Sequence, residues 1–412
     1  MTVTAARATA PDAAAAKSQE RKALAVAGGA HALHDGFTDL IWIALPIWQG
    51  EFGLSYAAAG ALRTVFAGTM ASLQIPSSML AEKIGPGTVL AAGTFLAGLC
   101  YCLASIGSGF WWLVGALLLG GIGAATQHPI GSAVVAHAFA GPRSLKALGA
   151  YNFSGDVGKV LLPATASALI LLMPWRPAYG LLGLVGILAA VAIFTLTPRF
   201  AFAAENTEAK PAATAEEIAA AARETARMKT GFRALVALGV ADSIMRGGFF
   251  VLLPFVLTGK GAHVSAAGFA LTLVFFGGAF GKLACGWFAT RFGKVFTIVM
   301  SKVGTAIGMI AILALPFELD FVLLPILGVI LNGVTTVTYG SVPDLVPPEK
   351  RTRAFSVFYT VTLAALAASP PASGFVGDLI GIHGAVIVVA VLTAATLPLA
   401  FLIRFAPAEA EA

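Results

Sequence analysis

Long apolar runs follow one another along almost the whole chain, and this feature most restricts what it can fold into. A helix needs about 20 apolar residues to cross the hydrocarbon core of a bilayer. Cutting the sequence at turn signals and charge clusters leaves twelve such stretches, and only 11% of the 412 residues are charged. An ordinary soluble domain has roughly a quarter of its residues charged. The sequence therefore predicts an all-α integral membrane protein with twelve transmembrane helices. The predicted spans are residues 24–49, 55–81, 87–107, 110–139, 146–172, 177–197, 232–257, 264–289, 295–315, 319–342, 353–376 and 380–404.

The distribution of basic residues predicts how these spans are oriented. With a cytoplasmic N-terminus, the tails and the even-numbered loops hold 19 of the 26 Lys and Arg residues, and the opposite loops hold only Arg176 and Lys260. Cytoplasmic loops of membrane proteins carry an excess of basic residues. Both termini are therefore expected in the cytoplasm, in a cytoplasmic (inner) membrane of the bacterial type. The net charge of +6 is explained by topology and does not indicate a nucleic-acid partner.

A single long polar stretch divides the predicted spans into two groups of six. It lies between the sixth and the seventh span, and its EEIAAAARETARM segment has the composition of a surface helix. The Ala-rich N-terminus, which carries several basic residues, predicts a disordered cytoplasmic tail. The expected organisation is a tail at 1–22, a six-helix bundle at 23–198, a cytoplasmic linker at 199–231, a second six-helix bundle at 232–405 and a tail at 406–412.

The two groups of spans share landmarks when the chain is compared with itself at a shift of 208 residues. Several matches in one register indicate two structurally equivalent halves, and parallel repeats of this kind place a substrate site between them near the membrane midplane. The pairs that match are Pro46 with Pro254, Gly60 with Gly268, Gly85 with Gly293, Tyr151 with Tyr359 and Pro163 with Pro371.

The loops after the second and the eighth predicted span carry related motifs, SMLAEKIGPG at 78–87 and GWFATRFGKVF at 286–296. Both resemble the G-x-x-x-D-R-x-G-R/K loop signature of the major facilitator superfamily. Ser78, Glu82 and Thr290 depart from that signature. The resemblance implies a pair of six-helix bundles, alternating access, a monomer and a cytoplasmic gate built from charge pairs in these loops. The gate residues that it implies are Glu82, Lys83, Gly85, Arg291, Gly293 and Lys294.

Two further stretches resemble the fosmidomycin-resistance subgroup of that superfamily. HALHDGFTDLIWIALPIWQGEFGLS, at 31–55, is similar to its first helix, and GIGAATQHPIGSAVVAHAF, at 121–139, is similar to its fourth helix with a His-Pro pair at His128-Pro129. The subgroup resemblance implies proton-driven drug efflux by an antiporter. Ile130 stands where an acidic residue is expected, and the antiport-type motif is only partly present as GDVGKVLLP at 155–163.

The first predicted span carries four ionisable residues at helical spacing. His31, His34, Asp35 and Asp39 step by three and four residues, so they share one side of a helix. Intramembrane ionisable groups are costly and usually face a cavity or a partner. Asp35 has no basic residue at helical spacing, so it is the first candidate for proton coupling. His34 is a weaker candidate, because a membrane histidine can also serve only as a hydrogen-bonded bridge between helices.

Two more pairs of opposite charges lie at helical spacing near mid-membrane. Asp156 and Lys159 are three residues apart, and Asp242 and Arg246 are four apart. One interpretation is that each pair only neutralises itself. The functional interpretation is that Lys159 and Arg246 hold an anionic group while the carboxylates carry protons, since Arg binds carboxylates in bidentate fashion and Lys acts as a point charge.

The predicted site therefore has a coupling set and a binding set. Lys282 and Lys302, nearer the cytoplasmic face, are expected to snorkel or to gate. Arg63 is expected to line the external mouth. The predicted proton-coupling residues are Asp35, Asp156, Asp242 and His34, and the predicted substrate-binding residues are Arg63, His128, Lys159, Arg246, Asp39 and Tyr151.

The same sequence argues against several other kinds of protein. No metal-ligand cluster, Walker motif or nucleophile–base arrangement stands out, so neither an enzyme nor a metal site is expected. Cys100, Cys102 and Cys285 lie inside apolar runs and are expected to pack. No cofactor is expected, the proton gradient being the energy source, and the expected partners are membrane lipids and a small, anionic molecule.

Three functions remain open from the sequence. The first is proton-coupled efflux of a small anionic compound or drug by a secondary active transporter. The second is proton-symport uptake of an organic anion through the same residues. The third is a non-transporting membrane receptor built on a carrier fold.

Overall fold

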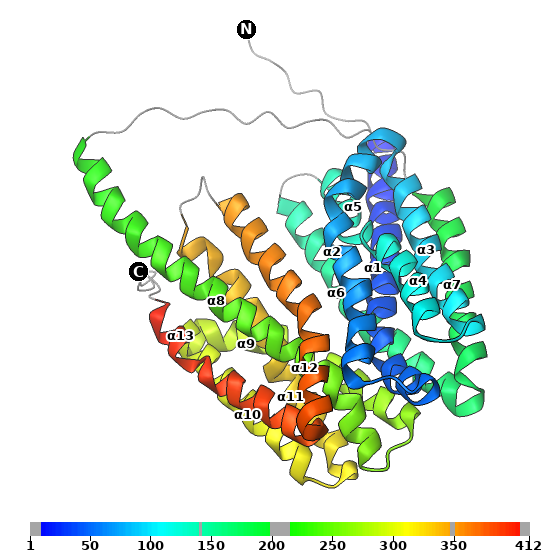
Figure 1. Ribbon diagram of the computed structural model, residues 1–412. Helices are drawn as coiled ribbons and strands as arrows, with labels where there is room; N and C mark the ends of the chain where they lie inside the picture. Colours follow the sequence, from blue (N-terminus) through cyan, green and yellow to red (C-terminus); the bar gives the residue numbers. More distant parts are fainter. Residues whose placement is uncertain (1–9, 140–141, 198–214, 347–350, 404–412) are drawn as a thin grey trace. The chain divides into compact units, whose positions relative to one another are not determined.

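The computed structural model describes residues 10–139, 142–197, 215–346 and 351–403, and every regular element in these ranges is helical (Figure 1). The helices are α1 (Ala10–Phe52), α2 (Tyr56–Ile84), α3 (Pro86–Ile106), α4 (Phe110–Ala124), α5 (Gln127–Ala138), α6 (Pro142–Leu172), α7 (Trp175–Leu196), α8 (Ala215–Gly259), α9 (Val264–Phe292), α10 (Lys294–Ala314), α11 (Phe317–Gly340), the short 3₁₀ helix η1 (Val342–Asp344), α12 (Arg351–Ala395) and α13 (Leu397–Leu402).

Nine stretches of the described chain are long and apolar enough to cross a membrane, so the protein is an integral, multi-pass membrane protein. The last stretch has 46 residues, more than twice the roughly 20 that one crossing needs. Gly381, with φ 80°, interrupts its helical backbone. The sequence predicts twelve crossings, three more than the nine stretches found in the described residues, so the number twelve stays a prediction. The nine stretches are Pro86–Ile106, Phe110–Ala138, Ala147–Leu172, Trp175–Leu196, Thr230–Gly259, Val264–Phe292, Lys294–Ala314, Phe317–Asp344 and Val357–Leu402.

The helix bounds agree with the 208-residue register of the internal repeat. Helices α2 and α9 both have 29 residues and begin 208 positions apart, at Tyr56 and Val264. Helices α3 and α10 both have 21 residues and show the same offset. Gly85 and Gly293 form the turns before them with φ of 93° and 91°, a conformation that glycine adopts without steric penalty. The two turns therefore share one backbone geometry.

The chain divides into two compact units, which we describe separately. Unit 1 comprises Met1–Thr38, Ser72–Leu162 and Met173–Ala204, and unit 2 comprises Asp39–Ala71, Pro163–Leu172 and Glu205–Ala412. These units group segments by packing, whereas the predicted bundles at 23–198 and 232–405 follow the internal repeat. The division into two six-helix bundles therefore remains a prediction.

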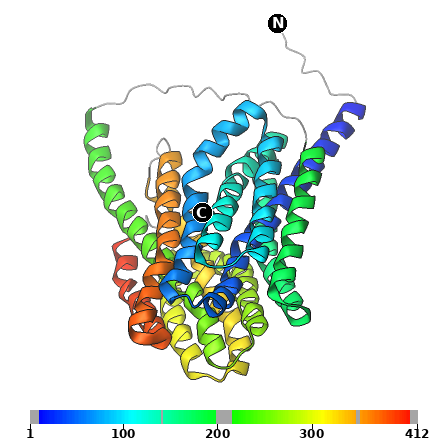
Figure 2. The ribbon, with the colours of Figure 1, turned by 45° about the vertical axis from the view of Figure 1, so that its right-hand side comes forward.

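In unit 1, α3 packs along α7 and α4, and these helices lie side by side in Figures 1 and 2. Small residues permit the close approach, since a Cβ on Gly98 would lie 2.6 Å from the Gly183 carbonyl oxygen. Gly123 ends the sequence GGIG at 120–123, and a Cβ on it would lie 2.4 Å from the Gly93 carbonyl oxygen. Its lack of a side chain therefore serves helix packing. The core of unit 1 is lined by Ala23, Ala27, Ala30, Ala81, Val89, Leu90, Ala91, Ile130, Val134, Val135, Ala147, Tyr151 and Ile193.

In unit 2, α9 packs on α11 and α8 packs on α12, as the green, yellow and orange ribbons of Figure 2 show. The start of α2 also packs on α12. There the Asp378 carboxylate accepts hydrogen bonds from the backbone N–H groups of Tyr56 and Ala57, at 2.8 and 3.0 Å. A Cβ on Gly374 would lie 2.3 Å from the Tyr56 carbonyl oxygen. The carboxylate thus caps the α2 N-terminus, where the first N–H groups of a helix lack partners.

Two predicted segments differ from the structure, and others lie outside it. Helix α1 begins at Ala10, inside the tail expected to be disordered, because its alanines have the highest helix propensity. Helix α8 begins at Ala215, so residues 215–231 of the expected linker are continuous with the following span. Residues 1–9 of the first tail, residues 199–214 of the linker and the whole tail at 406–412 lie outside the described chain.

Candidate functional site

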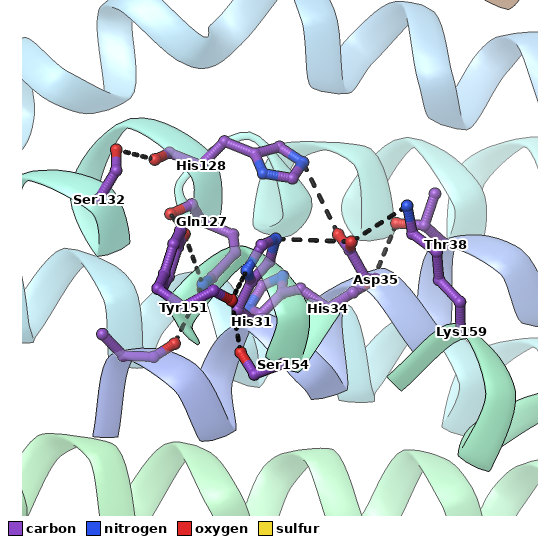
Figure 3. Close-up of polar contacts among 11 residues, drawn as sticks. His31, His34, Asp35, Thr38, Gln127, His128, Ser132, Tyr151, Ser154 and Lys159 are labelled. Atoms are coloured by element: carbon purple, nitrogen blue, oxygen red, sulfur yellow. Dashed lines mark hydrogen bonds and ion pairs between the residues drawn. The ribbon is translucent and has the colours of Figure 1, made fainter. Parts of the chain in front are cut away.

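Asp35 on α1 lies at the centre of a group of ionisable side chains in unit 1, and its side chain is only 9% exposed. Its Oδ2 is 3.3 Å from Lys159 Nζ on α6 and 3.4 Å from His31 Nε2, one turn earlier on α1. Its Oδ1 is 3.7 Å from His128 Nε2 on α5. Figure 3 shows Lys159 and His128 reaching the carboxylate from different sides. Three helices therefore place basic groups around one buried acid.

The expectation that Asp35 lacks a basic neighbour is wrong. It rested on the spacing along α1, whereas Lys159 comes from α6. The interpretation that Lys159 serves only a pair within its own helix fails for the same reason. Sequence spacing shows which residues share a helix face, but neighbours across a helix–helix contact depend on packing that one sequence does not reveal.

Glycines on α1 and α6 bring Lys159 within reach of Asp35. A Cβ on Gly158 would lie 1.8 Å from the Ala32 carbonyl oxygen, so the α6 backbone touches the α1 backbone there. A Cβ on Gly155 would lie 2.6 Å from Asp35 Oδ2. Close contact of this kind needs small residues. The glycines of the GDVGK stretch thus make room for the charge pair.

His31 is oriented by Tyr151 of α6. The His31 ring stacks on the Tyr151 ring with centroids 4.2 Å apart, and His31 Nδ1 lies 2.8 Å from the Tyr151 carbonyl oxygen. A carbonyl can only accept, so Nδ1 carries the proton. Nε2 is therefore the nitrogen that faces Asp35 and can take up a further proton. His31 is absent from the predicted site, although its i,i+4 spacing to Asp35 is a sequence signal that could have included it.

The His34 ring contacts different groups from those around His31. Its Nε2 lies 2.9 Å from Thr94 Oγ1 on α3, and that hydroxyl donates its own proton to the Leu90 carbonyl. Nε2 of His34 must then be the donor. This geometry favours the alternative that His34 bridges two helices. Its role in proton coupling stays a prediction.

His128 follows Gln127 at the start of α5, and Gln127 connects this helix start to Tyr151 of α6. Gln127 Nε2 donates to Tyr151 Oη at 3.2 Å and to the Ala27 carbonyl oxygen at 3.4 Å, which ties α5 to α6 and α1. The His128 ring meets the His31 ring edge-on, with centroids 5.2 Å apart. Pro129 fits at the first turn of α5, where its missing N–H is tolerated. The predicted His-Pro pair thus lies beside Asp35.

His31, Asp35 and His128 also form a group that could hold a metal ion, although no metal-ligand cluster stands out in the sequence. Each offers one ligand atom, and these atoms lie within 4.8 Å of one another. The Lys159 ammonium, 3.3 Å from the same carboxylate, already supplies a positive charge there. A divalent cation would be repelled unless Lys159 moved away. As arranged here, the carboxylate already has a cationic partner in Lys159.

The remaining predicted residue of α6 belongs to the same unit. Asp156 lies three residues before Lys159 and is half-buried.

Asp39 and Arg63 belong to unit 2 and are buried around Trp42. The Trp42 indole N–H donates to Asp39 Oδ1 at 3.1 Å. The Arg63 guanidinium lies 4.7 Å from the centroid of the Trp42 ring and 5.8 Å from that of Phe66, within the range of cation–π attraction. Arg63 thus stacks on aromatic rings in the interior of unit 2.

Asp242 on α8 forms an ion pair with Lys302 on α10, and both side chains are buried. The sequence had paired Asp242 with Arg246 and had placed Lys302 near the cytoplasmic surface. The interpretation that Asp242 and Arg246 only neutralise each other is wrong, because the partner of Asp242 comes from another helix. The expected snorkelling or gating role of Lys302 stays a prediction. Arg246, one turn further along α8, is half-buried.

The predicted gate residues lie at the ends of short helix connections. Lys294, the first residue of α10, forms an ion pair with Asp344 of η1. Arg291 lies 6.0 Å from the Phe292 ring centroid, whereas Glu82 and Lys83 are exposed. Gly85 and Gly293 form the two turns already described. None of this tests gating, which stays a prediction.

Comparison with known proteins identifies the family. The model of the Major Facilitator Superfamily matches residues 28–241 and 235–412. The chain belongs to the major facilitator superfamily. The curated relative and the solved structures that resemble this superfamily protein are themselves named as transporters.

The relatives of this major facilitator protein are distant. The probable L-galactonate transporter of Escherichia coli (strain K12) is 29% identical over 146 residues, which are 35% of this chain and 32% of that protein. The match therefore spans about a third of the length of the curated relative.

Solved structures share the fold over nearly the whole chain. A bacterial homologue of the human lysosomal transporter Spinster, in an inward-facing and unoccupied conformation, gives a TM-score of 0.75 at 17% identity, covering 95% of this chain and 99% of its own. A mutant of the nucleoside transporter NupG gives 0.74 at 13% identity, covering 94% and 100%. At such identities the likeness shows the fold alone.

Proposed function

We propose that the protein is a proton-coupled carrier that moves a small organic anion by alternating access, with Asp35 and Lys159 as its charge-exchange pair. The observation that carries the proposal is the 3.3 Å contact between the Asp35 carboxylate and the Lys159 ammonium, with His31 on the same oxygen. The relative named for L-galactonate supports an anionic substrate, since galactonate is a carboxylate.

Charge balance links the proton to the substrate. In the resting pair, Lys159 neutralises Asp35, and a buried charge that loses its partner costs about 3–5 kcal/mol. When an anionic group of the substrate binds Lys159, Asp35 loses its counter-ion and takes up a proton. His31 Nε2 and His128 Nε2, at 3.4 and 3.7 Å, are the groups beside it that can pass one on. Anion and proton then raise each other's affinity, as linkage requires.

This linkage favours symport over antiport. In an antiporter, proton and substrate compete, whereas here the proton on Asp35 leaves Lys159 available to the anion. Proton-symport uptake of an organic anion is therefore the leading function. Proton-coupled efflux remains the second candidate. The His-Pro pair that resembles the fosmidomycin-resistance subgroup includes His128, which lies 3.7 Å from Asp35 and so belongs to the proposed coupling group.

The other predicted residues keep proposed roles in this cycle. Asp156, Asp242 and His34 are proposed for coupling, and Arg63, Arg246, Asp39 and Tyr151 for the substrate pathway. The loop residues around Gly85 and Gly293 are proposed as the cytoplasmic gate. The ion pair between Lys294 and Asp344 supports a charged contact at that position.

The proposed setting is a cytoplasmic membrane of the bacterial type, with twelve crossings, both termini in the cytoplasm and a monomer as the working unit. The basic-residue distribution supports the orientation. The 46-residue stretch interrupted at Gly381 supports counting two crossings there.

The test uses the purified protein in proteoliposomes with an imposed pH gradient. Uptake of radiolabelled L-galactonate, gluconate, lactate and fosmidomycin is measured with the inside alkaline, which drives symport inward, and with the inside acidic, which drives antiport inward. Accumulation of a carboxylate with the inside alkaline supports the leading function. Accumulation of fosmidomycin only with the inside acidic supports efflux. No gradient-driven flux of any probe would overturn both.

Variants separate coupling from binding. Asp35→Asn imitates the protonated acid, so it should keep substrate exchange between the two sides while losing gradient-driven accumulation. Lys159→Gln should lose both. Lys22→Gln, which removes an exposed lysine from the first part of α1, is the matched control and should retain both. Unchanged accumulation in Asp35→Asn would exclude the pair as the coupling device.

A further inference from the structure

The two buried polar contacts at Asp242 and His34 occupy equivalent places in the internal repeat. A shift of 208 residues takes His34 to Asp242 and Thr94 to Lys302. His34 Nε2 hydrogen-bonds to Thr94 Oγ1 at 2.9 Å between α1 and α3. Asp242 forms an ion pair with Lys302 between α8 and α10. The same contact is therefore made by neutral groups in one repeat and by charged groups in the other.

The neutral version shows that the helix contact does not need charges. Helices α3 and α10 have equal lengths, and their bounds are 208 residues apart. All four side chains are at least nine-tenths buried. A buried ion pair is often no more stabilising than neutral groups of similar size, because its desolvation offsets its attraction. Packing alone does not account for Asp242 and Lys302.

The neighbourhood of the pair is polar on both helices. Ser243 follows Asp242 on α8, and Ser301 and Thr305 flank Lys302 on α10, all buried. Ser301 donates a hydrogen bond to the Ile330 carbonyl on α11 at 2.7 Å. Lys302 lies eight residues into a 21-residue span, so it is near mid-membrane. Buried intramembrane charges at such depth usually mark a substrate or ion pathway.

We propose that Asp242 and Lys302 form a second charge-exchange pair, in which Lys302 binds an anionic group of the substrate while Asp242 holds a proton. This inference rests on the proposed function. The proton adds to the Asp242 carboxylate, and the Lys302 ammonium keeps its protons and exchanges one anion for another. Lys302 thereby becomes a substrate-binding residue, whereas its position along the span had predicted that it snorkels or gates near the cytoplasmic face.

The decisive variant transplants the neutral contact of the first repeat. The double substitution Asp242→His with Lys302→Thr replaces the pair by residues that the chain itself uses at the equivalent contact. It should melt within a few degrees of the wild-type protein. Gradient-driven accumulation of the best probe should fall by roughly tenfold or more, within the range of typical coupling energies. Lys302→Thr alone should melt much lower, because it leaves Asp242 buried without its counter-ion.

A second buried pair serves as the control. Lys260 Nζ binds Asp320 Oδ2 at 2.6 Å and the Leu315 carbonyl at the end of α10 at 2.9 Å. Its neutral double variant, Lys260→Met with Asp320→Asn, should melt lower but keep accumulation per folded molecule.

Each outcome decides the question. If the transplanted variant melts as low as Lys302→Thr, the pair serves to hold the helices and the proposal is overturned. If it accumulates the probe as well as the wild type, the charges are dispensable and the proposal is also overturned. If the wild-type protein shows no gradient-driven flux, the proposed function fails first, and this inference fails with it.

Discussion

The Lys159 ammonium lies 3.3 Å from the Asp35 carboxylate and joins α6 to α1 across a contact of glycine backbones. The Asp35 side chain is buried, whereas about one third of the Lys159 side chain is exposed. A charge on one membrane helix is thus balanced by a charge on another, while the lysine stays accessible to an incoming anion.

Removing one partner should destabilise the protein more than removing both charges. Lys159→Gln leaves Asp35 without its main counter-ion and should lower the unfolding free energy by about 1–3 kcal/mol, less than for a fully buried pair because Lys159 is partly exposed. Asp35→Asn with Lys159→Gln should recover most of that loss. Thermal unfolding of the purified proteins in detergent checks both values. Equal loss in the single and double variants would mean that charge balance is unimportant here.

Gly158 should be the least replaceable glycine of α6. A Cβ there would lie 1.8 Å from the Ala32 carbonyl oxygen, so Gly158→Ala must push α6 away from α1, at a cost of about 1–3 kcal/mol or more. Gly149→Ala is the control on the same helix, since nothing lies within 4 Å of its added methyl group. Expression yield and melting temperature measure the difference. Similar behaviour of the two variants would contradict the close α1–α6 contact.

The only two basic residues of the predicted outer loops should both matter for stability. Arg176 donates to the Gly107 carbonyl at 2.6 Å, and Lys260 donates to the Leu315 carbonyl at 2.9 Å. Gly107 and Leu315 are the C-caps of α3 and α10 and lie 208 residues apart. Cations at helix C-termini are favourable.

Arg176→Met should therefore cost about 1.5–3 kcal/mol, the value of a charged hydrogen bond. Lys260→Met should cost about 3–5 kcal/mol, because it also leaves the fully buried Asp320 without its counter-ion. Melting temperatures in detergent test this order. A larger effect of Arg176→Met would contradict it.

His31 should influence proton coupling more than His34 does. His31 Nε2 faces Asp35, whereas His34 donates to Thr94. His31→Gln should change the pH dependence of gradient-driven uptake, while His34→Gln should mainly lower stability. His263→Gln, at the N-cap of α9, is a histidine control outside the cluster. If His34→Gln shifted the pH profile and His31→Gln did not, the assignment would be reversed.

The elements of the site were visible in the sequence to different degrees. Asp35 and His128 stood out because a charge or a His-Pro pair inside an apolar run is rare, and Lys159 stood out for the same reason. Their mutual contact did not, because α1, α5 and α6 meet through glycines whose partners lie far away in the chain. Spacing along a single helix gave Asp242 the wrong partner, Arg246 instead of Lys302, and it did not reveal that Lys159 of α6 also reaches Asp35 of α1.

The sequence by itself determined the helical membrane fold, its repeat and the family. Hydropathy selects the spans because a bilayer excludes unsatisfied backbone groups, and the 208-residue register follows from residues that need positive φ or end a helix. Only the tertiary structure decided which charges neutralise which. An ion pair depends on distances of a few ångströms across helix contacts, and these are set by side-chain packing instead of by position along the chain.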